Sequence, residues 1–233
     1  MASRAEESRI KAVYQKRKRS IPLDFYSLLR LHNLLRIQQL ERKLVRLLSA
    51  SRHQQMVDQR VLEVGCGCGL WLNTFLRLGA LPENMAGVDV LEERIAEAEE
   101  MLPRGITLRC RSSEQLDFAD ASFDLVFQSM LFSSILDPQV RRQIAAEMLR
   151  VLAPGGMILW YDFFLDNPFN ADVRGVKKKE IAEYFPGCRI ALGTTTLAPP
   201  IARKISRNSP ILHGLLSAMP FLRSHYFGSI TPC

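Results

Sequence analysis

A glycine-rich stretch and an acidic residue downstream of it are the residues of this sequence best suited to bind a ligand. The stretch 63–69 (EVGCGCG) follows a short β-rich segment, and Asp89 ends the next one, 20 residues beyond Gly69. Glycines let the backbone turn sharply and approach a ligand closely at the electropositive start of a helix. A carboxylate at the end of the next strand accepts hydrogen bonds from ribose hydroxyls. Together they predict a site for a nucleoside-containing cofactor.

The spacing of the glycines distinguishes between two kinds of such cofactor. Nicotinamide dinucleotides bind at G-x-G-x-x-G, whereas Gly69 comes one residue too early for this pattern. The spacing therefore counts against a ligand with a pyrophosphate. A nicotinamide-dependent oxidoreductase is the less favoured alternative.

Strands and helices alternate along the chain, which predicts an α/β fold with right-handed crossovers. We expect a Rossmann-like, seven-stranded, mostly parallel sheet sandwiched by helices. The expected strands are 60–64, 85–90, 106–110, 123–128, 157–161, 189–197 and 225–230. Ligands of such sheets bind at the carboxyl ends of the strands, so the residues there are the ones to consider.

We expect the chain to consist of three parts. Residues 1–56 would be a basic helical cap, with a long helix from an N-capping Asp24 to Ala50. Residues 57–197 would be the cofactor-binding core. Residues 198–233 would be a basic insert plus the final strand, packed on the core.

The charge is divided along the 233 residues. The net charge is +9 over residues 1–60, −7 over 61–183 and +5 over 184–233, where no acidic residue occurs. A nucleic-acid-binding protein with a uniformly basic surface would not divide in this way, and no nucleic-acid partner is expected. The basic arms suit an anionic substrate, a membrane surface, or plain exposure to solvent.

The cysteines and the N-terminus indicate the compartment. Five cysteines, two of them one residue apart in the glycine turn, form no disulfide framework. The N-terminus has no apolar signal-peptide core. We therefore expect a cytoplasmic protein, with possible contact to the inner membrane surface. No metal site is expected, since no His/Cys pair follows Cys66 and Cys68 at zinc spacing.

Four stretches resemble, in order, the class I S-adenosylmethionine-dependent methyltransferases. They are LEVGCGCG (62–69), GVDV (87–90), SSEQLDFADASFDLVFQSMLFSSI (112–135) and EMLRVLAPGGMILWYDF (147–163). The resemblance covers about residues 57–165 and is closest in style to the small-molecule, type 11-like branch. It implies an enzyme with S-adenosyl-L-methionine as its cofactor.

The resemblance also implies which residues hold the cofactor. The methionine part would contact the glycine turn, Asp89 would bind the ribose hydroxyls, and the fourth strand would end beside the transferred methyl group. Where the family commonly has an adenine-binding Asp, this chain has Ser112. The implied cofactor residues are Glu63, Gly65, Cys66, Gly67, Gly69, Asp89, Val90, Ser112, Ser113, Glu114, Gln128 and Ser129, with Tyr14 and Arg17 from the N-terminal cap.

A general base is not obvious, because Ser133 and Ser134 stand where the family often has a histidine. Asp162, after the fifth strand, and His225, at the start of the seventh, are the catalytic candidates. The basic arms would cover the same edge and contribute substrate contacts. The substrate-binding candidates are Tyr26, Ser133, Arg174 and Tyr226.

The whole chain resembles, more weakly, bacterial methyltransferases of polysaccharide biosynthesis. The similar stretches are FYS (25–27), NPFNADVRG (167–175) and PFLRSHYFG (220–228). They favour O-methylation of a sugar hydroxyl on a small-molecule or glycan acceptor, nucleotide- or lipid-linked. N-methylation of a small molecule and a non-catalytic binding module are the alternatives.

Overall fold

The computed structural model describes residues 2–22, 24–167, 170–205 and 209–233. Its centre is one seven-stranded sheet in the order β3-β2-β1-β4-β5-β7-β6, in which β7 runs antiparallel to the other six strands. The strands are β1 (Val61–Val64), β2 (Met85–Asp89), β3 (Thr107–Cys110), β4 (Phe123–Ser129), β5 (Leu152–Phe163), β6 (Cys188–Leu197) and β7 (Arg223–Pro232). The expected seven-stranded, mostly parallel sheet is confirmed.

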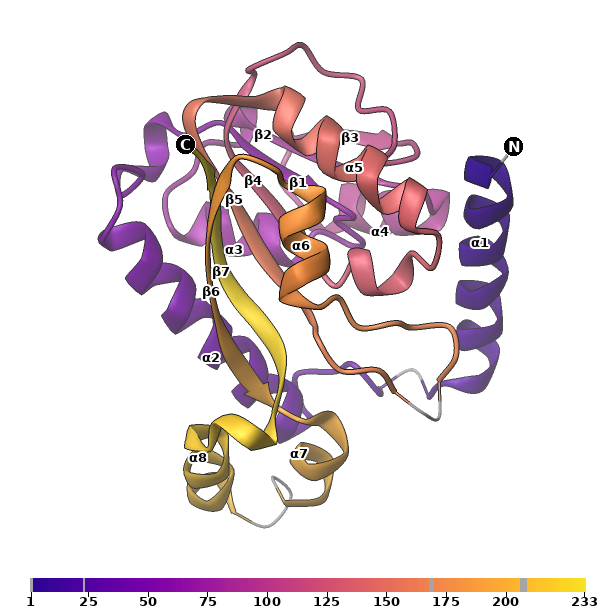
Figure 1. Cartoon of the computed structure of the whole chain (residues 1–233). Coiled ribbons are helices and arrows are strands. Elements are labelled where there is room, and N and C mark those ends of the chain that lie inside the picture. The colour runs from indigo at the N-terminus through magenta and orange to yellow at the C-terminus, as the bar shows by residue number, and fades with distance from the viewer. Residues whose placement is uncertain (1, 23, 168–169, 206–208) are drawn as a thin grey trace.

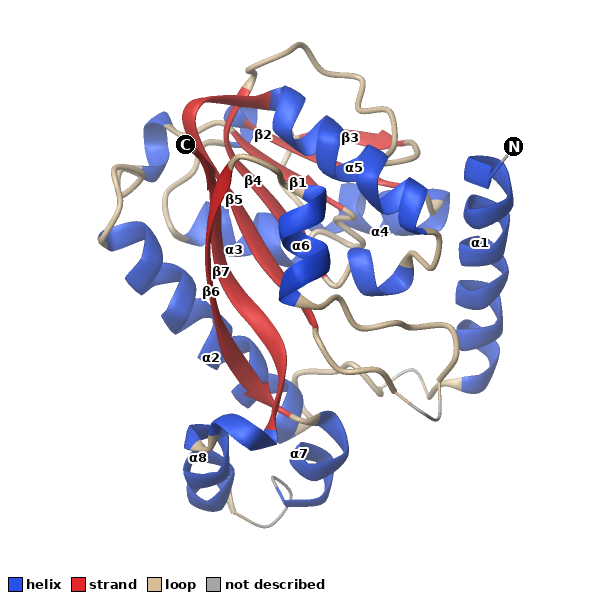
Figure 2. Ribbon diagram, viewed as in Figure 1, coloured by secondary structure: helices blue, strands red, loops and turns tan. Residues whose placement is uncertain are grey.

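Helices cover both faces of the sheet (Figure 2). One face packs against α5 (Pro138–Val151) and α6 (Lys178–Tyr184), and the other against α2 (Leu31–Ser49), α3 (Leu70–Arg77) and α4 (Glu92–Met101). The central strands are buried on both faces, and all four residues of β1 are inaccessible. Such strands are mostly apolar because neither face meets water, and Glu63 is the polar exception in β1.

Three further helices lie toward the edges of the molecule. The first, α1 (Ala2–Ser20), stands apart from the sheet beside α5. The other two, α7 (Pro199–Ile205) and α8 (Pro210–Ala218), belong to the segment of chain that connects β6 to β7, and they lie beyond the ends of these two strands (Figure 1). Short 3-10 helices occupy Met56–Asp58, Pro82–Asn84, Phe132–Ser134 and Pro220–Leu222. Among the residues described, no helix is both long and apolar enough to cross a membrane.

Two expected boundaries are wrong. The helix expected from Asp24 begins only at Leu31, because the Asp24 carboxylate is paired with Arg30 at 2.8 Å and the preceding residues form turns. The fifth strand begins at Leu152 rather than at Met157, because Leu152 already pairs with Phe123 of β4. The Pro154-Gly155-Gly156 segment lies inside the strand, where the register between β4 and β5 shifts. Pro168 and Phe169, in the 167–175 stretch, lie outside the described residues.

Candidate functional site

The glycines of the turn between β1 and α3 have two different roles, close packing and access to the backbone. Gly65, Gly67 and Gly69 all have positive φ, between +53° and +79°. A Cβ at Gly69 would lie 2.5 Å from Leu102 Cδ1, so this glycine permits close packing. A Cβ at Gly67 would meet no atom within 4 Å, so the space there is open. A ligand can therefore approach the backbone at Gly67.

Asp89 connects this turn to the end of β2. Its Oδ2 accepts a hydrogen bond from Gly67 N at 2.9 Å, and its Oδ1 accepts one from Leu91 N at 3.0 Å. Burial raises the pKa of its carboxyl, and the backbone hydrogen bonds oppose this rise. Each carboxylate oxygen keeps a further lone pair, so Asp89 can also accept hydrogen bonds from a ligand diol.

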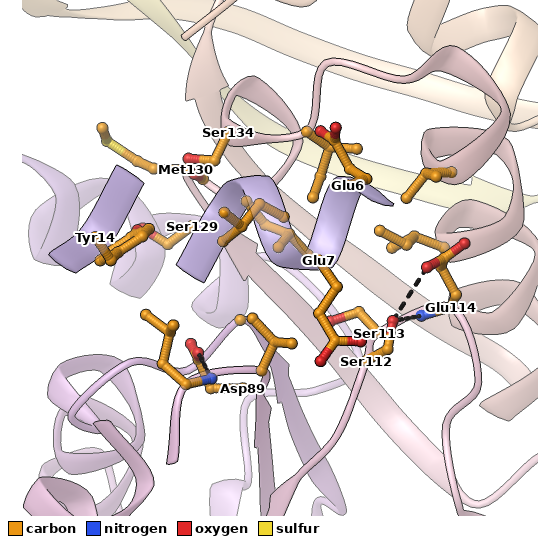
Figure 3. Close-up of a pocket in the computed structure, with 18 residues that line it drawn as sticks. Glu6, Glu7, Tyr14, Asp89, Ser112, Ser113, Glu114, Ser129, Met130 and Ser134 are labelled. Atoms are coloured by element: carbon orange, nitrogen blue, oxygen red, sulfur yellow. Dashed lines mark hydrogen bonds between the residues drawn. The ribbon is translucent and has the colours of Figure 1, made fainter. Parts of the chain in front are cut away.

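A cavity of about 130 Å³ opens at this edge of the sheet, between Asp89 and α1 (Figure 3). The sequence-predicted residues that line it are Tyr14, Gly65, Asp89, Val90, Ser112, Ser113, Glu114 and Ser129. The lining residues that the sequence did not predict are Glu6, Glu7, Ile10, Leu91, Met130, Leu131, Ser134, Ile135, Val140 and Ile144. The second set adds an apolar wall and two carboxylates.

Among the described residues, the lining of the cavity contains four carboxylates, those of Glu6, Glu7, Asp89 and Glu114. Two of them are paired with cations of α1, Glu6 with Arg9 and Glu7 with Lys11. Asp89 accepts hydrogen bonds from backbone N–H groups, so its carboxylate is the acidic group of the site best placed to bind a ligand diol.

Helix α1 is anchored across the cavity by its first turns. Glu6 Oε1 accepts a hydrogen bond from Leu136 N at 2.5 Å, and Arg9 Nη2 donates one to Ser134 O at 2.5 Å. Glu6 and Arg9 also pair with each other at 2.8 Å. Although burial raises the pKa of Glu6, the hydrogen bonds from Arg9 and Leu136 lower it below its ordinary value. The only signal in the sequence was a Glu and an Arg spaced i,i+3, which is common on exposed helices.

We expect Glu6→Ala to loosen α1. Losing a charged, partly buried hydrogen bond costs about 1.5–3 kcal/mol, so amide exchange of residues 4–14 should accelerate by about 10- to 100-fold. Hydrogen exchange followed by mass spectrometry measures this. Ser8→Ala is the control, because Ser8 is exposed and bonds only within α1. Equal exchange in the Glu6→Ala and Ser8→Ala variants would contradict the anchoring role.

Several implied cofactor residues lie beneath the turn rather than in the cavity lining. Glu63 is 1% exposed, accepts a hydrogen bond from Leu72 N at 3.1 Å, and has its pKa raised well above the ordinary value by burial. Gln128 is buried and accepts from Leu131 N at 3.2 Å. Cys66 is buried against Gly87. These residues fix the shape of the turn and of the loop after β4.

Asp162, near the end of β5, also holds the loop after β4. It is 0% exposed, and its two oxygens accept hydrogen bonds from Ser133 N at 3.1 Å and Phe163 N at 2.8 Å. Burial raises the pKa of Asp162 to about 6, against hydrogen bonds that lower it. The carboxylate thus positions Ser133, which is itself buried.

This raised pKa predicts how stability depends on pH. A carboxyl whose pKa is higher in the folded protein stabilises the fold at low pH, and this contribution is lost as the pH rises through about 6. Relative to Asp162→Asn, the wild type should lose about 2 kcal/mol of unfolding free energy between pH 4.5 and 7.5. Urea unfolding of both proteins at each pH gives the difference. A constant difference would show that Asp162 titrates normally.

His225 lies in an aromatic environment on β7. Its ring stacks on Tyr161 at a centroid distance of 4.8 Å and contacts Phe163 at 3.9 Å. Its Nδ1 lies 2.9 Å from Ser224 Oγ, while Nε2 is buried and has no hydrogen-bond partner among the described residues. Burial, with a contribution from Arg36, lowers the pKa of His225 well below its ordinary value. The imidazole is therefore neutral at pH 7.

Neither Asp162 nor His225 lines the cavity, and Gly67 and Gly69 also lie outside its lining. The remaining predicted residues are dispersed around the edge and do not line it either. The Arg17 guanidinium lies 5.2 Å from the Tyr14 ring centroid, and Tyr26 is exposed. Arg174 pairs with Glu180 at 2.6 Å. Tyr226 stacks on Phe164 at 4.5 Å. Within the described part of the chain, no cluster of three His, Cys, Asp or Glu residues is arranged to hold a metal ion.

This chain is similar in sequence to known proteins. Residues 61–156 match a family described as "Methyltransferase domain". A ubiquinone biosynthesis O-methyltransferase of Parvibaculum lavamentivorans is 34% identical over 104 residues, which are 43% of this chain and 39% of that protein. A phthiotriol/phenolphthiotriol dimycocerosates methyltransferase of Mycobacterium ulcerans is 28% identical over 163 residues, or 68% and 58% of the two chains.

A solved structure supports the same fold. The magnesium protoporphyrin IX methyltransferase of Synechocystis, with bound S-adenosylmethionine, superposes with a TM-score of 0.57 at 17% identity, over 84% of this chain and 80% of that chain. The matches to the two curated relatives span about two fifths and three fifths of their lengths. The residues that match the family model include the glycine turn and Asp89.

Proposed function

We propose that this chain is a class I S-adenosylmethionine-dependent methyltransferase and that it transfers the methyl group of that cofactor to a hydroxyl oxygen of a small-molecule acceptor. The observation that carries the proposal is the cavity that brings Gly65 of the glycine turn together with Asp89 and the serines after β3. A nucleoside cofactor suits this lining, and the glycine spacing disfavours a dinucleotide.

The residues of the cavity fit S-adenosylmethionine. Asp89 would accept the ribose hydroxyls, and Val90 with the serines after β3 would flank the adenine. The glycine turn would contact the methionine part, with Gly65 in the cavity lining and open space at Gly67. The cofactor supplies a methyl group on a sulfonium, which is an excellent leaving group.

The reaction needs little more than positioning and a proton acceptor. The acceptor oxygen forms a bond to the methyl carbon as the carbon–sulfur bond breaks, and the hydroxyl proton must leave. We assign its removal to His225, because the imidazole is neutral and its Nε2 has no partner among the described residues. Asp162 is less suited, since both of its oxygens already accept backbone hydrogen bonds. The products are a methyl ether, S-adenosylhomocysteine and a proton.

The acceptor we favour is a sugar hydroxyl on a nucleotide- or lipid-linked glycan. The resemblance of the outer stretches to methyltransferases of polysaccharide biosynthesis supports the sugar. The name of the Parvibaculum relative supports oxygen as the acceptor atom. The basic arms would suit the phosphates of such a carrier.

The proposal is tested in two steps with the purified chain. Calorimetry with S-adenosylmethionine, S-adenosylhomocysteine and NAD should give roughly micromolar binding of the first two only. Transfer of a radiolabelled methyl group is then measured with a lipid-linked sugar, a nucleotide sugar, a quinol and an amine. Label in a hydroxyl acceptor, reduced at least about 10-fold by His225→Gln, would support the assignment.

Other outcomes would overturn parts of this proposal. Label only in the amine would make the chain an N-methyltransferase. Cofactor binding without transfer to any acceptor would favour a non-catalytic module. Binding of NAD alone would reject methyl transfer altogether.

A further inference from the structure

Helix α8 buries polar side chains and exposes apolar ones, the reverse of a helix that packs on the core of a soluble protein. The residues that it buries against the protein are His213 and Ser217, whose side chains lie 3.4 Å apart. Its apolar residues Ile211 and Leu215, one turn apart, are 77% and 62% exposed. A helix that packs on a core in water buries its apolar side and exposes its polar side. The outer face of α8 is therefore suited to an apolar environment.

The apolar surface continues beyond α8. Phe221, in the short helix that follows, is 79% exposed, and Leu212 and Met219 are exposed as well. Single exposed apolar residues are common on soluble proteins, but contiguous groups mark interaction sites. We refer to Ile211, Leu212, Leu215, Met219 and Phe221 as the α8 patch.

A second exposed apolar segment lies beside this insert. Residues 24–30, before α2, carry Leu29, which is 97% exposed, together with exposed Tyr26 and Leu28. The segment contacts α7 through Arg203, whose guanidinium lies 5.6 Å from the Phe25 ring centroid. Apolar side chains thus protrude from two segments, far apart in sequence, that meet at α7.

The charge around this surface is positive. Residues 184–233 contain five Lys and Arg and no acidic residue, and Arg203 and Lys204 of α7 are exposed. Protruding apolar side chains next to cations match a lipid surface with anionic headgroups, where the former enter the acyl boundary and the latter bind phosphates. An apolar protein partner would not require the cations.

The position of the insert is also informative. Because β6 runs parallel to β5 and β7 antiparallel to it, the connection between β6 and β7 lies at the carboxyl edge of the sheet. The same edge carries Gly65 and Asp89. We infer that the α8 patch, with the cations of α7, docks the protein on an anionic membrane surface with the carboxyl edge toward the lipid. This inference goes beyond the proposed function and holds whether or not transfer occurs.

Flotation of the full chain with vesicles tests the inference. We expect binding to vesicles of phosphatidylcholine with phosphatidylglycerol, and weaker binding to phosphatidylcholine alone or at high salt. The triple variant Ile211→Ser, Leu215→Ser, Phe221→Ser should lower partitioning at least about 10-fold. Arg203→Glu with Lys204→Glu should lower it on anionic vesicles only.

A matched control replaces three exposed apolar residues at the opposite edge. Val57, Leu81 and Met101 precede β1, β2 and β3 and are all exposed. Their replacement by Ser should leave flotation unchanged, and circular dichroism with thermal melting checks that every variant is folded. Absence of wild-type flotation, or equal loss in the control, would overturn the inference. The inference would also be overturned if the wild type formed dimers and bound no vesicles, while the triple α8-patch variant was monomeric. A second copy of the chain would then cover the patch.

Discussion

Replacing Asp89 by alanine is expected to weaken the binding of S-adenosylmethionine by at least about 100-fold, because two hydrogen bonds to a charged acceptor, each worth about 1.5–3 kcal/mol, would be lost. The same carboxylate holds the backbone of Gly67 and Leu91. The substitution therefore removes a ligand contact and also loosens the turn that the ligand approaches. Both effects act in the same direction.

Titration calorimetry of wild type and variants measures this loss. Asp89→Asn keeps one acceptor oxygen and should lose less affinity than Asp89→Ala. Asp58→Ala is the matched control, because Asp58 is an exposed acid that follows Val57 at the opposite edge of the sheet. Affinity of Asp89→Ala within about threefold of wild type would show that the ribose is held elsewhere.

Gly228→Ala is expected to destabilise the fold by about 3 kcal/mol, which is the upper part of the range for an overpacked site. A Cβ at this position would lie 2.0 Å from the carbonyl oxygen of Ala191 on β6. The contacted atom belongs to the backbone of a paired strand, so no side-chain rotation relieves it. β7 lies between β5 and β6, and Gly228 pairs with Trp160 and Leu192. The strands themselves would have to separate.

The control for this substitution lies on the neighbouring strand. Gly193 of β6 pairs with Phe227, and a Cβ there would meet nothing within 4 Å. Gly193→Ala should be neutral or stabilise by about 0.5 kcal/mol, because alanine reduces the entropy of the unfolded chain. Urea denaturation of the three proteins gives the comparison. Equal unfolding free energies would mean that β6 moves away without cost.

The two predictions concern strands on opposite sides of the sheet. Asp89 ends β2, and β1, β2 and β4 lead into the cavity. Gly228 lies in the middle of β7, which carries His225 and follows the insert that contains α8. A change in β7 should therefore disturb His225 and the α8 patch before it disturbs the cavity.

The expectations that missed are those in which a local preference competes with a specific partner, either a few residues away or on a neighbouring strand. Asp24 has the composition of an N-cap, yet Arg30 engages its carboxylate and α2 begins later. Pro154-Gly155-Gly156 has the composition of a turn, yet the pairing of β5 with β4 begins before it. In both cases a specific partner outweighs a local preference.

The sequence alone determined the glycine turn, the acid that follows it at the end of the next strand, and the alternation of strands and helices. These features depend on backbone conformation and on apolar patterns over a few residues, which can be deduced from local residue types. Only the tertiary structure decided that Glu6 closes the cavity by accepting a hydrogen bond from Leu136, 130 residues away. It alone decided that α8 presents Ile211 and Leu215 outward and buries His213. Which side of a helix meets the core depends on how the chain packs around it, and a periodic pattern gives the sides of a helix but not their neighbours.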